Sequence, residues 1–371
     1  MNIDPFVILT TRISFRSLGL LALLAAYVAF SLFLFFQWVN PSLDGRTDQH
    51  IAADSTIYIY FADSIREGQD NPYVLAALYT FPNTFWAPVL LALVLKSNFA
   101  IVIADYVMFL ASFLLLKKSF SFSTGVFIGL LLLNPTTTIS LLSVNKEIID
   151  MLSISMFLYS RRTHRSGVLF ASLMLALVNR YEVCAVMLLF LLAESSLNPW
   201  RQRRFMTVAA LIIALDVILP LFASNALAVR FEEASGGGMV TWLDTLEMHY
   251  LYFVAFIPKI SENVFGELFN ISAWRTYGVS DLANSYILWF NNLAYAIVFI
   301  VLARKRLLTI RSSIIYLSIL GASLMAVALV IQPRYFYFIY VLLCLQAAHP
   351  SAKKPAQVCI LNRHPREVAN A

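Results

Sequence analysis

The sequence has few charged residues for its length. Only 13% of its 371 residues are Asp, Glu, Lys or Arg, whereas 60% are hydrophobic and the mean hydropathy is +0.75. A soluble domain of this size needs a much larger charged surface to stay in water. The composition therefore excludes the ordinary soluble classes and predicts an integral membrane protein, an all-α bundle of transmembrane helices.

Cysteine and histidine are also scarce. The three cysteines form no CxxC pair, and the five histidines are scattered without an HExxH motif. This pattern favours neither a disulfide framework nor a zinc site. No cofactor is required, although a divalent cation is compatible with the acidic residues. The net charge of +6 is spread over short basic runs between apolar segments, so we expect no nucleic-acid partner.

The apolar runs alternate with short basic turns, which sets a topology by the positive-inside rule. About ten spans are predicted, with both termini in the cytoplasm and short interfacial or re-entrant helices on the outer side. The first run is long enough to span and lacks a small-residue cleavage site, so we expect it to be retained. The predicted spans cover 18–38, 99–116, 123–142, 148–159, a pair of short helices within 167–193, then 206–223, 286–303, 313–331 and 336–346, with a half-inserted outer helix at 85–95.

The pair within 167–193 follows from a polar interruption, Asn179-Arg180-Tyr181-Glu182. One continuous helix would place Arg180 near the middle of the bilayer, at a cost of about 2.5–3.5 kcal/mol on insertion scales. Two short helices that meet at 179–182 avoid that cost if their junction faces a wet cavity in the outer half of the membrane.

The whole chain reads as one membrane domain, 1–371, without internal repeats. Its predicted parts outside the membrane include a first outer loop at 39–84, a long outer loop at 224–285 and a cytoplasmic tail at 347–371. Most of the 27 basic residues fall in segments assigned to the cytoplasm, whereas only three of the 21 acidic residues do, Asp4, Glu194 and Glu367.

The first outer loop is strongly acidic. Within it, Ile57, Phe61 and Ile65 recur at helical spacing, which predicts an amphipathic helix lying at the interface. Asp54 would stand at the N-terminal end of this helix, close to the membrane surface. It could also be the helix N-cap, which is a purely structural role.

Three basic residues, Lys146, Arg180 and Arg334, lie at outer turns between helices, and each has a polar companion. Brought together, they would form a cationic pocket for the phosphate of a lipid carrier, since arginine binds such oxygens bidentately. Glu182 and Tyr335 complete the predicted substrate-binding set. Nearby carboxylates could accept the proton of an attacking sugar hydroxyl; the candidates are Asp54, Glu147, Asp150 and Glu182.

Simpler roles are open for the same residues. Lys146 with Glu147, or Arg180 with Glu182, could be ion pairs that hold helix ends together. Lys146 and Arg334 could reach lipid headgroups. Tyr335, Tyr337 and Tyr340 fit an interfacial aromatic belt. The intramembrane acids Asp105 and Asp216 could carry function or bond a neighbouring helix.

The order of these features resembles the GT-C superfamily of membrane glycosyltransferases, which use polyprenyl-phosphate-linked sugars. Asp54, Tyr58 and Ala62 are similar to the acidic residue, tyrosine and alanine of that family's first outer loop. Glu147, which follows Pro135, is similar to its second acidic residue, with Asp150 as the other candidate. The resemblance implies that Asp54 is the catalytic base and that Glu147 assists it. Ser55 stands where the family usually has a second acid.

The second half, with a long outer loop and an arginine turn before the last helix, resembles Wzy-type and EpsG-like polysaccharide polymerases. That resemblance implies functional roles for Arg180 and Arg334. Together the two resemblances imply transfer of a sugar or glycan repeat from an undecaprenyl-(di)phosphate carrier, at the outer face of a bacterial inner membrane. The product would be a surface polysaccharide such as O-antigen or exopolysaccharide.

Two other functions are open. A secondary transporter or lipid flippase would use Asp105, Asp216 and Arg180 for coupling or for substrate binding. A non-catalytic membrane subunit would depend on none of the outer charged residues individually.

Overall fold

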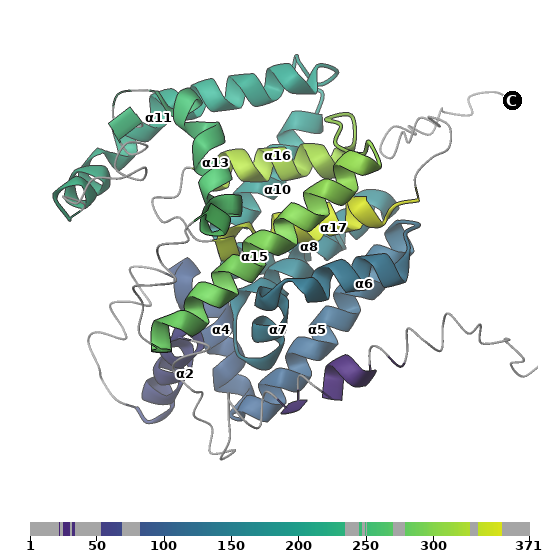
Figure 1. Cartoon of the computed structure of the whole chain (residues 1–371), viewed down its shortest axis with the longest axis vertical. Coiled ribbons are helices and arrows are strands. Elements are labelled where there is room, and N and C mark those ends of the chain that lie inside the picture. The colour runs from purple at the N-terminus through teal and green to yellow at the C-terminus, as the bar shows by residue number, and fades with distance from the viewer. Residues whose placement is uncertain are drawn as a thin grey trace, which may run out of the picture.

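The protein is described here by a computed structural model that covers residues 53–68, 82–233, 251–269, 279–326 and 333–350, with a few positions at 22–33 and 245–249. All regular secondary structure in these residues is helical, so the all-α prediction is confirmed. Figure 1 shows the helices gathered into one bundle, with α11 along its upper edge and α2 and α4 at its lower end.

The helices differ widely in length, from 8 residues in α7 to 30 in α11. The first half contains α2 (Ala53–Arg66), α4 (Pro82–Leu95), α5 (Asn98–Ser119), α6 (Thr124–Leu133), α7 (Pro135–Leu142), α8 (Lys146–Thr163) and α9 (Ser166–Asn179). The second half contains α10 (Tyr181–Glu194), α11 (Arg204–Glu233), α13 (Tyr252–Phe269), α15 (Val279–Arg304), α16 (Ser313–Met325), the 3₁₀ turn η2 (Pro333–Phe336) and α17 (Tyr337–Ala348).

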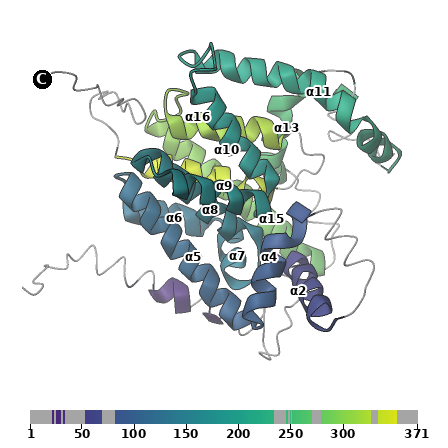
Figure 2. The same ribbon diagram turned by 180° about the vertical axis from the view of Figure 1, so that it is seen from behind.

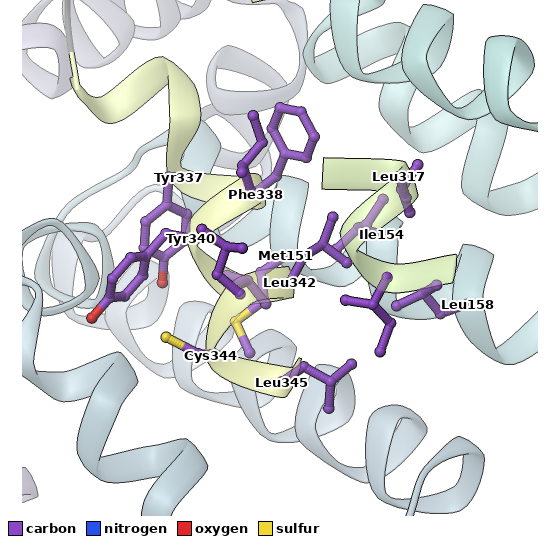
Figure 3. Close-up of a cluster of buried hydrophobic side chains, with 14 of the residues drawn as sticks. Met151, Ile154, Leu158, Leu317, Tyr337, Phe338, Tyr340, Leu342, Cys344 and Leu345 are labelled. Atoms are coloured by element: carbon purple, nitrogen blue, oxygen red, sulfur yellow. The ribbon is translucent and has the colours of Figure 1, made fainter. Parts of the chain in front are cut away.

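The core is built around α17, which lies in the middle of the bundle (Figure 1). Every residue of this helix is buried, and it packs against α6, α8, α15 and α16. Figure 3 shows side chains of α8, such as Met151 and Ile154, beside Leu342 of α17. Twelve residues of helix are only about 18 Å long, so α17 is an interior helix rather than a bilayer-length one.

The aromatic-belt interpretation is wrong for Tyr337 and Tyr340. Both lie in the core with their rings side by side, as Figure 3 shows. Their hydroxyls find partners there, since the Tyr337 hydroxyl bonds to the Thr137 hydroxyl at 3.0 Å and Tyr340 donates to the carbonyl of Leu130. A tyrosine whose hydroxyl is satisfied can be buried at little cost.

The predicted span at 123–142 is wrong as one helix, because it breaks at Asn134 and Pro135. Proline has no N–H to donate and its ring clashes with the preceding turn, so α6 ends there. Asn134 then caps α7 by accepting a hydrogen bond from the N–H of Thr136 at 2.9 Å. The two helices meet at an angle of 82°.

The prediction of about ten full spans is wrong. Among the described residues, α5 is the one helix that is long and apolar enough to cross a membrane. The bent pair α6–α7 adds a second candidate span if the two helices are counted as one. Five other apolar helices have only 10–17 residues, namely Trp86–Leu95, Ser166–Asn179, Leu288–Arg304, Ser313–Met325 and Arg334–Ala348. The predicted division at 179–182 is confirmed, since α9 ends at Asn179 and α10 begins at Tyr181.

In the first outer loop a helix does form, as predicted, and Phe61 of its predicted apolar face is buried. Tyr58, Phe61 and Ala62 of α2 pack on α4, whereas Ile57 and Ile65 are exposed. The segment predicted as a long outer loop, 224–285, is also partly helical, because α11 extends to Glu233 and α13 lies within it.

Two helical glycines make a matched test of the packing. A Cβ at Gly321 of α16 would lie 2.9 Å from Cζ of Phe338 in α17, whereas a Cβ at Gly129 of α6 would have nothing within 4 Å. We expect Gly321→Ala to destabilise the protein by about 1–3 kcal/mol through overpacking. Gly129→Ala should be neutral or stabilising by up to about 1 kcal/mol. Thermal unfolding of both variants measures this, and equal midpoints would contradict the close approach of α16 to α17.

Candidate functional site

The site begins at the break between α9 and α10, where Arg180 adopts an extended conformation. In Figure 2, α9 lies against α8 and α10 continues beyond the break. Arg180 Nη2 donates a hydrogen bond to Glu147 Oε1 at 2.9 Å, and its Nη1 lies 3.3 Å from Asp150 Oδ2. The arginine is only 5% exposed, so one buried guanidinium joins two carboxylates of α8.

The preceding residue, Asn179, fixes this arrangement. Its Nδ2 donates both to Asp150 Oδ1 at 2.7 Å and to the carbonyl of Lys146 at 2.9 Å. One side chain at the end of α9 therefore holds the first turns of α8 in place. This bond also orients the Asp150 carboxylate toward the guanidinium of Arg180.

A band of buried polar side chains extends from Glu147 toward α15. Ser140 of α7 donates to Glu147 Oε2 at 3.4 Å. One turn earlier, Thr136 Oγ1 donates to Asn291 Oδ1 of α15 at 2.9 Å, and Thr137 bonds to Tyr337. The hydroxyls and amides of this band therefore satisfy one another.

The turn η2 brings Arg334 and Tyr335 to the same place. The Tyr335 ring centroid lies 5.2 Å from Cζ of Arg180 and 5.6 Å from Cζ of Arg334, so both guanidinium groups are within cation–π distance of one ring. A segment more than 150 residues away from Arg180 thus joins the site.

Electrostatic interactions connect the charged side chains of the site. The charges of Arg180 and Arg334 both act on the buried carboxylate of Glu147. Lys146 interacts with Arg180, Glu147 and Asp150. The site therefore holds three cations around two carboxylates.

The structure brings together five of the seven site residues predicted from the sequence, namely Lys146, Glu147, Arg180, Arg334 and Tyr335. Glu182 is half-buried in the first turn of α10, where its charge acts on Arg180 and Lys146. Asp54 is the second residue of α2, and its side chain lies outside the described part. Tyr58, one turn further along α2, acts electrostatically on Arg180, so this helix lies next to the site.

Asn179, Asn291 and the hydroxyls of α7 were not singled out from the sequence as site residues. A signal was present for the two asparagines, since each interrupts an otherwise apolar run. The alternative that Arg180 forms an ion pair is confirmed, but the predicted partner, Glu182, is wrong. The structure pairs Arg180 with Glu147 and Asp150.

The two acids that were predicted to lie within the membrane, Asp105 and Asp216, differ from each other. Asp216 of α11 accepts a hydrogen bond from the backbone N–H of Tyr252, as expected of a residue that bonds a neighbouring helix. Asp105 of α5 is fully buried, and neither of its oxygens has a hydrogen-bond partner among the described residues. Within the same part of the chain, no group of three or more His, Cys, Asp or Glu side chains could hold a metal ion.

No protein-family model, curated protein or solved structure matches this chain.

Proposed function

We propose that this chain is an integral membrane glycosyltransferase or polymerase. It transfers a sugar or a glycan repeat from an undecaprenyl-(di)phosphate carrier to an acceptor hydroxyl, in the synthesis of a bacterial surface polysaccharide. The observation that carries this proposal is that three distant segments of the chain meet at one site. The first contributes Lys146 and Glu147, the second Arg180, and the third Arg334 and Tyr335.

The distribution of apolar side chains supports a membrane location. The exposed side of α5 carries a stripe of large apolar residues, and its buried side carries polar ones. This is the inverse of a helix on the surface of a soluble protein, and a continuous exposed apolar stripe suits contact with lipid. The exposed residues are Phe99, Ile103, Val107, Leu110 and Leu114, and the buried polar ones are Asn98, Asp105 and Ser112.

The two ends of α8 support an orientation in that membrane. Its first turn holds the charged site, and its last turn holds Arg161 and Arg162. Eighteen residues of helix separate these two ends by about 27 Å. Basic residues prefer the cytoplasmic side. The site then faces the outer side of the bacterial inner membrane, where lipid-linked glycans are presented.

The cations of the site suit a phosphate-bearing donor. Within the described residues, Nε of Arg180 has no hydrogen-bond acceptor, although the side chain is buried. An unsatisfied buried donor is costly, and a phosphate oxygen would satisfy it. In the transfer, the bond between the anomeric carbon and the phosphate oxygen breaks, and the phosphate leaves with the electron pair. The acceptor oxygen bonds to that carbon from the opposite face, and its proton passes to a carboxylate.

The test uses purified protein in lipid vesicles, supplied with an undecaprenyl-diphosphate-linked glycan and analysed for elongated product. We expect Arg334→Ala to reduce the rate by about 10²–10³-fold, because it removes a charge that stabilises the leaving phosphate. Arg304→Ala, an equal loss of charge at the other end of the bundle, should leave the rate unchanged. Normal elongation by Arg334→Ala would remove the assignment.

The buried, unpartnered Asp105 favours a second function, a secondary transporter or lipid flippase. The experiment for this function measures the movement of lipid between the two leaflets of a vesicle membrane. Flipping that is lost in Asp105→Asn and retained in Arg334→Ala would favour this function over glycosyl transfer.

A further inference from the structure

A second candidate site lies at the opposite end of α8 from Glu147. It is a small recess, partly open to solvent, between the ends of α5, α8 and α16 and the side of α10. Arg161 lies fourteen residues beyond Glu147 on α8, which places the two about 21 Å apart along the helix. The lining residues are Phe120, Leu158, Arg161, Arg162, Phe190, Ser313 and Ile314.

The recess combines an apolar wall with two guanidinium groups. Phe120, Leu158 and Phe190 are buried core residues, so the wall continues the interior of the bundle. Arg161 Nε is buried, and no hydrogen-bond acceptor lies near it in the described part of the chain. A buried cationic donor without an acceptor is costly, and an anionic oxygen is the acceptor that would compensate it best.

The surroundings of the recess are basic. Glu194, a nearby acid, forms an ion pair with Arg204, whose Nη2 lies 2.8 Å from Glu194 Oε1. Arg204 also donates to Ser313 of the recess wall and to the carbonyl of Arg311, so it shapes the rim. A ligand that enters here therefore meets positive charge at the mouth and apolar side chains inside.

We infer that this recess binds the phosphate headgroup of an anionic phospholipid, with Arg161 and Arg162 on the phosphate and the apolar wall against the upper acyl chain. Charge complementarity selects this occupant, because a zwitterionic headgroup would bring its own cation to a basic rim. The inference rests on the membrane location under the proposed function but not on glycosyl transfer. An inorganic phosphate shares the anionic chemistry without the chain.

The experiment measures lipid binding and thermal unfolding of the full chain in neutral detergent. The probes are phosphatidylglycerol, phosphatidylcholine and inorganic phosphate. We expect phosphatidylglycerol to bind and to raise the unfolding midpoint, and the other two to do neither. Equal effects of phosphatidylglycerol and phosphatidylcholine, or an equal effect of phosphate alone, would overturn the lipid site.

Variants locate the binding. Arg161→Gln is expected to weaken phosphatidylglycerol binding by about tenfold or more, whereas Arg203→Gln removes the same charge outside the recess and should bind normally. The exposed Arg162→Gln gives a second reading if Arg161→Gln fails to fold, as judged by its midpoint without lipid. Binding by both recess variants at the level of Arg203→Gln would overturn the site. Because the readout is binding, its failure and a failure of glycosyl transfer are distinguishable.

Discussion

Replacement of Arg180 by alanine is expected to destabilise this protein severely. The substitution leaves Glu147 and Asp150 in the interior without their shared cation, and the side chains of these acids are only 3% and 0% exposed. Breaking a buried ion pair by removing one partner typically costs about 3–5 kcal/mol, because the remaining charge has neither solvent nor partner. The measurement is the midpoint of thermal or denaturant unfolding in detergent.

A matched control exists on α2. Arg66 pairs with Asp63 at 2.7 Å, but these side chains are 34% and 49% exposed. Arg66→Ala should therefore cost no more than about 1 kcal/mol. Adding Asp150→Asn to Arg180→Ala should restore part of the lost stability, because it removes one of the two stranded charges. If Arg180→Ala proves as mild as Arg66→Ala, the buried triad is not what holds α8 and α9 together.

Replacement of Asp54 by asparagine is expected to abolish glycan elongation while the protein still folds and inserts. Under the proposed function, a carboxylate must accept the proton of the attacking hydroxyl, and loss of such a base reduces rates by about 10²–10⁴-fold. Asp54 precedes Tyr58 by one turn, about 6 Å along α2, and Tyr58 lies close enough to Arg180 to act on its charge. Elongated product at equal protein levels is the quantity to measure.

Two further variants separate chemistry from structure. Asp63→Asn changes a partly exposed acid of the same helix, which pairs with Arg66, and should elongate glycan normally. Glu147→Gln should reduce both the rate and the unfolding midpoint, because it weakens the bond to Arg180 as well as the chemistry. Asp54→Asn should lower the rate alone. Polymer at the normal level in Asp54→Asn would exclude this residue as the base.

Some of this site could be predicted because charge is expensive in apolar surroundings. The polar interruption at 179–182 had to break a helix and reach a partner, and the structure confirms the break. The basic turns at Lys146 and Arg334 stood out for the same reason, and the structure places them beside Arg180. The course of the surrounding apolar runs was less predictable. Pro135 divides one of them, and α17 is buried on all sides, where hydropathy alone suggested a membrane span.

The sequence by itself determined that this chain is helical, where its apolar runs are interrupted, and which charged residues need a partner of opposite charge. Only the tertiary structure decided which residues those partners are. The charge of Glu182, two residues on, acts on Arg180, but the ion pairs of Arg180 are made with residues of another helix. The packing of α9 on α8 instead brings Glu147 and Asp150 to its guanidinium, and Asn179 holds them there. Likewise, an apolar helix surrounded by lipid and one surrounded by protein have the same composition. The interior position of α17 is therefore a property of the packed bundle.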